Sequence, residues 1–202
     1  MKRKYLALLF SILMIFSLIP TSAFAATSAS VGEGVADIVI SATEPDEKGG
    51  IKVELSVTPG ANKYLTAYTF AVQYDPALVV PDMDAEGAYY REAFGKRNYF
   101  GVSLSGINAT NSFTTSTFED NNRSIFQATD VNIDGLYNEV NPFSVTFYFE
   151  QTADAKTSGG KAKFKLLTGQ ASGTELFTIS VYGEDSPIID LNDDADLSTS
   201  LT

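Results

Sequence analysis

The chain has 202 residues, enough for one or two domains, and carries 14 Lys+Arg against 25 Asp+Glu, a net charge of −11. An acidic chain without a basic stripe repels phosphate backbones, so we expect no nucleic-acid binding. The absence of Cys and His excludes disulfides, thiolate nucleophiles, imidazole triads and metal sites built on those side chains. Carboxylates remain, and calcium prefers such oxygen ligands.

The first 25 residues are typical of a secretory signal peptide. A basic Lys2-Arg3-Lys4 precedes an apolar run over residues 5–19, and Ala23-Phe24-Ala25 has small residues at the positions that a signal peptidase recognises. We expect cleavage after Ala25 and a secreted, extracellular or cell-surface product of net charge −14. The alternative is an uncleaved anchor, but a run of about 15 apolar residues is short for a bilayer. Since no second long apolar run follows, we expect no integral membrane protein.

The remaining chain consists of short β-rich runs between turns. A flexible leader is predicted over residues 26–36. Apolar and polar residues then alternate most clearly over residues 51–58, 66–74 and 143–150. The other predicted strands are 36–43, 77–80, 98–104, 112–118, 124–128, 161–167 and 175–182. Such spacing predicts an all-β fold, an antiparallel β-sandwich of the jelly-roll type with about nine strands, spanning residues 37–184.

Three segments lack this alternation. Residues 82–97 are less regular, and residues 83–96 are predicted to form a short helix or a long loop. Residues 152–160 are predicted to form a polar turn. Residues 185–202 are predicted to form an acidic, solvated tail.

Residues 68–80, Tyr-Thr-Phe-Ala-Val-Gln-Tyr-Asp-Pro-Ala-Leu-Val-Val, resemble the third-strand region of cohesin modules, the receptor domains of bacterial cellulosome scaffolds. Asp75 and Pro76 form a tight turn, because Pro presets φ and Asp can accept a backbone hydrogen bond. The resemblance extends over residues 37–182, but only the Tyr-Asp-Pro segment is specific. The same turn occurs in related sandwiches, including carbohydrate-binding modules of the cellulosome type, and residues 82–97 depart from the cohesin pattern.

The resemblance implies a non-catalytic binding module that presents one sheet face to a protein partner, a dockerin-bearing protein. No dockerin-contacting residues can be carried over individually, so the binding residues stay unassigned. Two alternatives remain open. One is an extracellular structural protein that self-assembles through open sheet edges. The other is a carbohydrate-binding module with a tyrosine platform that stacks on polysaccharide.

Residues 130–141 read Asp-Val-Asn-Ile-Asp-Gly-Leu-Tyr-Asn-Glu-Val-Asn, which resembles the calcium loops of EF-hands and dockerins. The predicted calcium ligands are the side chains of Asp130, Asn132, Asp134 and Asn138 and the carbonyl of Leu136. Position 12 is the uncharged Asn141, and the flanking segments are strands rather than helices. The alternative is a polar hairpin loop without an ion. A second pattern, Asp190-Leu191-Asn192-Asp193-Asp194, lacks the glycine and fits the acidic tail better.

Two further groups of residues have functional and structural interpretations. Tyr89, Tyr90, Phe94, Tyr99 and Phe100 form an aromatic cluster that would stack on sugars or, as we favour, fill the core. A carboxylate pair for glycoside hydrolysis would come from Glu119, Asp120, Glu139 and Glu150. Nothing in the sequence brings two of these carboxylates to a defined separation. We therefore expect no enzyme.

Overall fold

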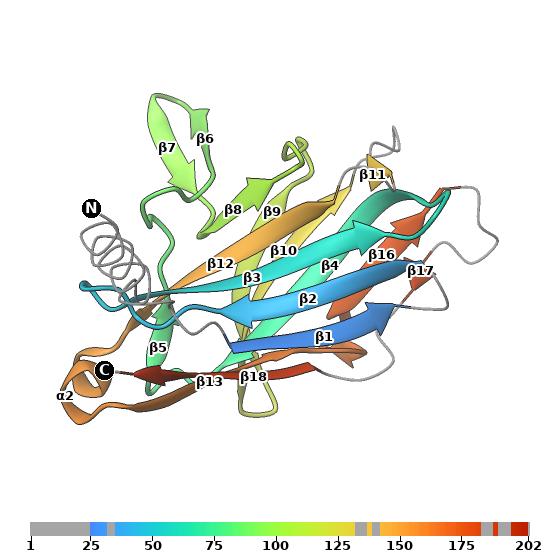
Figure 1. The fold of residues 1–202 in the computed structure, drawn as a ribbon. Coiled ribbons are helices and arrows are strands. Elements are labelled where there is room, and N and C mark those ends of the chain that lie inside the picture. The colour runs from blue at the N-terminus through green and yellow to red at the C-terminus, as the bar shows by residue number, and fades with distance from the viewer. Residues whose placement is uncertain are drawn as a thin grey trace, which may run out of the picture.

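The computed structural model describes residues 25–31, 35–131, 137–138, 142–182, 188–189 and 195–201. Two β-sheets pack face to face in this part of the chain, and every pairing between the described strands is antiparallel (Figure 1). The predicted fold class, an all-β antiparallel sandwich, is confirmed. No described helix is long and apolar enough to cross a membrane.

The six-stranded sheet is the front layer in Figure 1. Its order is β1 (Ala25–Val31), β2 (Ala36–Ala42), β3 (Gly50–Pro59), β12 (Phe143–Gln151) and β5 (Val79–Pro81), and β8 (Val102–Ser105) also pairs with β12. The predicted strand over residues 98–104 is interrupted at Gly101, whose φ of +67° breaks the extended backbone.

The eight-stranded sheet forms the second layer. Its order is β17 (Ile188–Ile189), β16 (Phe177–Val181), β4 (Tyr64–Tyr74), β10 (Arg123–Val131) and β9 (Thr114–Asp120). Three more strands belong to the same sheet: β11 (Tyr137–Asn138) and β13 (Gly160–Leu166) pair with β4, and β18 (Ala195–Leu201) pairs with β13. Two separate hairpins complete the strands: β6 (Tyr90–Ala93) with β7 (Lys96–Tyr99), and β14 (Gln170–Ala171) with β15 (Thr174–Glu175).

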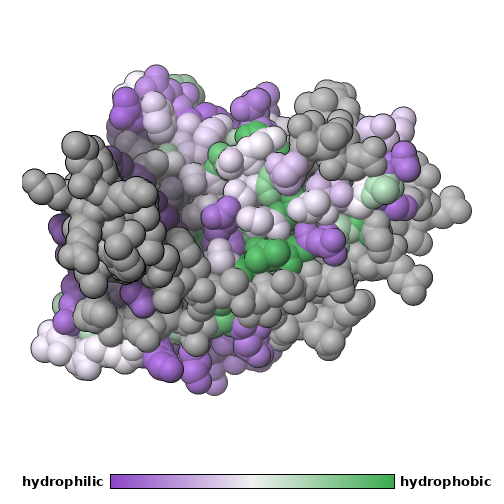
Figure 2. Space-filling view, viewed as in Figure 1, coloured by the Kyte–Doolittle hydropathy of each residue, from purple (hydrophilic) through white to green (hydrophobic). Residues whose placement is uncertain are grey.

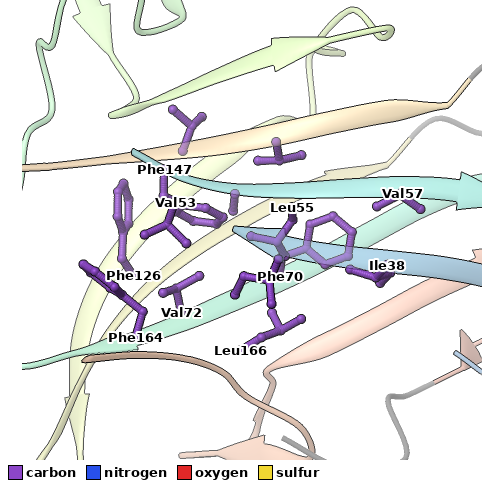
Figure 3. Close-up of a cluster of buried hydrophobic side chains, with 14 of the residues drawn as sticks. Ile38, Val53, Leu55, Val57, Phe70, Val72, Phe126, Phe147, Phe164 and Leu166 are labelled. Carbon is purple, nitrogen blue, oxygen red and sulfur yellow. The ribbon is translucent and has the colours of Figure 1, made fainter. Parts of the chain in front are cut away.

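One hydrophobic core fills the space between the sheets (Figure 3). The alternating residues of β3 point inward, and Val53, Leu55 and Val57 are completely buried. Phe126 of β10 packs edge-on against Phe147 of the opposite sheet, with ring centroids 5.1 Å apart. Burial of each such side chain contributes about 1.5–3 kcal/mol, which explains how the sandwich is stable without a disulfide.

Four segments differ from the sequence-based expectations. The predicted flexible leader contains all of β1 except Ala25, and the small residues of this strand carry almost no hydrophobic signal. The predicted tail contains β18, with Leu197 buried against the core. The predicted irregular segment at 82–97 forms most of the β6–β7 hairpin. Instead of a polar turn, α2 (Ala153–Ser158) follows β12, and the Thr152 hydroxyl caps its first turn by accepting from Ala155 N–H.

Candidate functional site

The predicted calcium loop lies only partly within the described residues. Asp130 is the penultimate residue of β10, and Asn138 belongs to β11. Asn132, Asp134 and Leu136 lie outside the described residues. Among the side chains that are described, no group of three or more acidic residues is arranged to hold a metal ion. The calcium loop therefore stays a prediction.

Asp130 has a clear structural role. Its carboxylate is completely buried and accepts hydrogen bonds from the Thr110 hydroxyl, from Thr110 N–H at 3.2 Å and from Val131 N–H at 3.0 Å. Thr110 belongs to the loop before β9. A buried carboxylate is tolerated because these donors compensate its lost hydration, and they hold the loop against β10.

The predicted aromatic cluster divides into two groups. Tyr89 and Phe100 are half-buried and pack around the completely buried Phe113, with ring centroids 5.3–5.5 Å apart. Tyr90 and Phe94 are exposed on the β6–β7 hairpin. The exposed tyrosines of the described chain, Tyr64, Tyr90 and Tyr182, belong to different segments and form no row on one strand.

The predicted carboxylates do not form a described pair for hydrolysis. Glu119 and Asp120 lie on β9 and Glu150 lies on β12, in the other sheet, while Glu139 is outside the described residues. The Arg123 guanidinium, 2.6 Å from Asp120, lowers the pKa of that carboxyl, and the hydroxyl of Ser172 adds to the effect. A general acid for hydrolysis needs a raised pKa, so the lowered pKa of Asp120 suits an ion pair instead.

A row of threonines crosses the outer face of the eight-stranded sheet. The pairing registers place Thr178 of β16, Thr69 of β4, Thr129 of β10 and Thr114 of β9 side by side. The hydroxyl oxygens of Thr69 and Thr129 are 3.2 Å apart and share a hydrogen bond. We call these four residues the threonine row.

Three exposed apolar or aromatic residues lie where this face ends. Tyr64 is 48% exposed, Val131 42% and Tyr182 70%. The N–H of Tyr182 donates to the carbonyl of Tyr64 at 2.8 Å, which holds the two tyrosines at the same end of the sheet. We call these three residues the aromatic rim. Tyrosines combine a large apolar ring with a polar hydroxyl, so they are favoured in protein interfaces.

The β14–β15 hairpin covers another part of the same face. Leu176, beside this hairpin, is completely buried with Ile125 and Ala171 in a small second hydrophobic cluster. The Gln127 side-chain amide donates to the carbonyl of Glu175 at 2.7 Å, which ties the hairpin to β10. Within the threonine row, Thr69 and Thr178 are buried, Thr129 is half-buried and Thr114 is exposed, and the aromatic rim is exposed beyond this cover.

The outer face of the six-stranded sheet is different. Outside the grey atoms, Figure 2 shows small hydrophobic areas separated by pale and hydrophilic residues. Val39 of β2 is exposed on this face, at 40%. Among the side chains described for β2, β3, β5, β8 and β12, no large aromatic ring is exposed as Tyr64 and Tyr182 are.

Two shallow concavities lie near the edges of the sandwich. The first has a volume of about 590 Å³, and we call it the acidic concavity because five carboxylates and two lysines line it: Asp46, Asp82, Asp84, Glu86, Glu150, Lys48 and Lys52. Burial and the nearby charges of Glu150 and Asp84 raise the pKa of Asp82. The second, of about 540 Å³, is lined by Lys161, Lys163 and Lys165 of β13.

Sequence reasoning missed the threonine row and the acidic concavity. The threonines come from strands as far apart in the chain as β4 and β16, and only the pairing registers align them. The lysines of β13 do alternate in the sequence, so their common face could have been predicted.

No known protein family matches the sequence, and no curated protein matches it either. Among solved structures, the chain is similar to a cohesin module from a Clostridium perfringens family 33 glycoside hydrolase, with 9% identity, a TM-score of 0.43, and 90% and 97% of the two chains covered. It is also similar to a type II cohesin domain from the Acetivibrio cellulolyticus cellulosome, with 10% identity, a TM-score of 0.46, and 79% and 87% covered.

A third similarity is to the major pilin SpaA of Corynebacterium diphtheriae, with 13% identity and a TM-score of 0.41, covering 75% of this chain and 38% of that one. Two of these three structures are cohesin modules, the family that residues 68–80 resemble. We base the proposed function on the residues of this chain.

Proposed function

We propose that the protein is a secreted, non-catalytic module that binds a protein partner on the outer face of its eight-stranded sheet. The observation that carries this proposal is the threonine row beside the aromatic rim. The exposed Thr114 and the half-buried Thr129 offer hydroxyl groups for hydrogen bonds, and the tyrosine rings of the rim offer apolar contact. The partner class, a dockerin-bearing protein, comes from the cohesin resemblance alone.

The binding surface can be tested with two threonines of β9. Thr114 lies in the threonine row, and Thr117 is exposed on the same strand but pairs with Phe126, so it lies on the opposite side of the strand. Thr114→Arg places a long charged side chain in the proposed interface, whereas Thr117→Arg does not. We expect Thr114→Arg to weaken binding at least tenfold, a loss of about 1.4 kcal/mol, and Thr117→Arg to leave it unchanged.

Binding is measured by titrating purified dockerin-bearing proteins of the source organism onto immobilised residues 26–202. A complex that both variants form with wild-type affinity would place the interface elsewhere. If no dockerin-bearing protein binds the unmodified chain, the proposed partner class is wrong.

The proposal includes a calcium ion in the loop over residues 130–141. Calcium that binds only the folded protein raises its melting temperature. We expect calcium to stabilise the wild-type protein relative to chelator, and Asp134→Asn to remove most of that increase. Asp37→Asn, on an exposed position of β2, is the control for charge. Equal melting temperatures of the wild type in calcium and in chelator would refute the calcium site.

Secretion is tested directly on the expressed full-length chain. Cleavage after Ala25 predicts an exported product whose N-terminal residue is Ala26. N-terminal sequencing or intact mass measurement of the culture supernatant checks this. A product that keeps residues 1–25 and stays with the cells would favour the anchor instead.

A further inference from the structure

The β6–β7 hairpin projects from the sandwich (Figure 1, upper left). Among the described strands, β6 and β7 pair only with each other. The register joins Ala93 to Lys96, so the loop has two residues, Phe94 and Gly95. Both have positive φ, 53° and 72°, which is the pattern of a type I′ turn.

The base of this hairpin is firmly attached to the sandwich. The Arg91 guanidinium donates to the carbonyl of Thr110 at 2.6 Å and lies 5.4 Å from the ring of Phe100. Thr110 is itself bonded to the buried Asp130. Together with the packing of Phe113, these contacts hold the base in a defined position, so the tip is preorganised for binding.

The residue at the tip does not contribute to folding. Phe94 is fully exposed, so its ring gains nothing from burial. Its positive φ is unfavourable for a bulky residue and costs about 1–2 kcal/mol. An exposed aromatic ring on a strained turn, at the end of an anchored hairpin, is the geometry of an element that inserts into another surface.

The hairpin is basic on an otherwise acidic protein. It carries three cationic side chains, Arg91, Lys96 and Arg97, against the single carboxylate of Glu92, whereas the chain as a whole has a net charge of −11. Arg97 lies over the ring of Tyr90, with the guanidinium carbon 4.6 Å from the ring centroid. These charges favour an acidic partner.

A second copy of this chain supplies such a partner. Its acidic concavity carries more carboxylates than lysines and has room for an aromatic side chain. Burial, followed by the charges of Glu150 and Asp84, raises the pKa of Asp82, and cations from a partner offset those neighbouring charges. An anionic lipid surface is less favourable, because the whole acidic molecule is repelled by it.

We propose that the β6–β7 hairpin of one copy docks into the acidic concavity of a second copy, with Phe94 in the concavity and Lys96 and Arg97 facing its carboxylates. This contact uses a different surface from the threonine row and the aromatic rim. It is therefore independent of the proposed function, and either can fail while the other holds.

The variant Phe94→Asn tests the contact without disturbing the hairpin. Asparagine tolerates positive φ, and Asn-Gly is the preferred type I′ sequence, so the hairpin is retained or stabilised while the ring is lost. Tyr182→Asn is the matched control, since it removes an exposed aromatic side chain from the aromatic rim. Melting temperatures confirm that both variants fold.

Sedimentation velocity of residues 26–202 from about 1 µM to about 300 µM measures self-association. We expect the wild type to associate at about 50 mM NaCl and to dissociate at about 500 mM, where screening is strong. Phe94→Asn should weaken association at least tenfold, and Tyr182→Asn should not. The charge reversal Arg97→Glu should also weaken it, and adding Glu86→Lys should restore part of the affinity.

Three results would overturn the proposal. The first is a wild-type protein that stays monomeric over the whole range at both salt concentrations. The second is association that Phe94→Asn leaves unchanged. The third is a monomeric protein that sediments with phosphatidylglycerol vesicles and loses this binding in Phe94→Asn, which would make a membrane the partner of the hairpin.

Discussion

Asp46 and Asp82 line the same concavity, but their pKa values shift in opposite directions. The N–H groups of Gly50 and Lys48 donate to the Asp46 carboxylate at 2.8 Å and lower its pKa below 3.8. Burial, followed by the charges of neighbouring carboxylates, raises the pKa of Asp82 above 3.8. The ionised form therefore stabilises the fold at Asp46 and destabilises it at Asp82.

These shifts predict opposite effects of two substitutions. At pH 7, Asp46→Asn should lower the melting temperature. The ionised Asp46 carboxylate stabilises the folded protein, and this stabilisation is fully present above pH 3.8. That loss shrinks as the pH falls through the lowered pKa of Asp46. Asp82→Asn should raise the melting temperature at pH 7, and the gain should shrink as the pH falls through the raised pKa of Asp82 and the wild-type carboxylate becomes protonated. Thermal melts of the three proteins from pH 7 to pH 3.5 check both signs. Shifts of the same sign at pH 7 would contradict the electrostatic explanation.

A second residue-scale prediction concerns two glycines with positive φ. A Cβ at Gly106 would lie 2.5 Å from the carbonyl oxygen of Pro142, whereas a Cβ at Gly173 would meet nothing within 4 Å. The φ values are 78° and 80°, so Ala strains the backbone similarly at both positions. We expect Gly106→Ala to destabilise the protein by at least about 1 kcal/mol more than Gly173→Ala, because backbone atoms must move. Urea unfolding of both variants measures the difference, and equal losses would contradict the close approach of Gly106 to Pro142.

At the scale of elements, β18 shows that the acidic C-terminal segment contributes to the core. Its pairing with β13 buries Leu197, while Asp196 on the other face is exposed and lies 3.4 Å from the Lys165 ammonium. Leu197→Ala should cost about 2–3 kcal/mol, since it leaves a cavity beside β13. Asp196→Ala should cost less than about 0.5 kcal/mol, since an exposed ion pair contributes little. Chemical denaturation of both variants measures these losses in unfolding free energy. A negligible loss in Leu197→Ala would instead support the acidic, solvated tail that the sequence predicts.

At the scale of the whole molecule, Phe126 joins the two sheets. It is completely buried and packs edge-on against Phe147 and Phe149 of the opposite sheet. Phe126→Ala should destabilise the protein by about 3–5 kcal/mol. Because one core connects both sheets, far-UV and near-UV circular dichroism should still report a single coincident transition. Two separated transitions would show that the sheets unfold independently.

Much of the fold could be predicted because strand alternation is a local property. The runs at residues 51–58, 66–74 and 143–150 correspond to β3, β4 and β12 with bounds that differ by two residues at most. The strands β1 and β18 could not be recognised, because Ala, Ser and Thr give little contrast between the two faces of a strand. The hairpin at Phe94-Gly95 was missed because phenylalanine is an unusual residue for a type I′ turn.

The candidate site could be predicted much less completely. The spacing of Asp130 to other oxygen-bearing residues predicts a calcium ligand, which stays a prediction, whereas its hydrogen bond from Thr110, twenty residues earlier, leaves no local signal in the sequence. The threonine row depends on Thr69 and Thr178 being paired across two strands, and nothing near either residue indicates that pairing.

The sequence by itself determined the all-β class and the acidic surface, because both follow from which residues are present and how neighbours alternate. Only the tertiary structure decided which threonines share one face, which chain ends pair as strands, and that the base of the β6–β7 hairpin is anchored while its tip is exposed. The physical reason is that strand register and packing are set by contacts between residues distant in the chain, and these contacts leave no periodic signal in either partner alone.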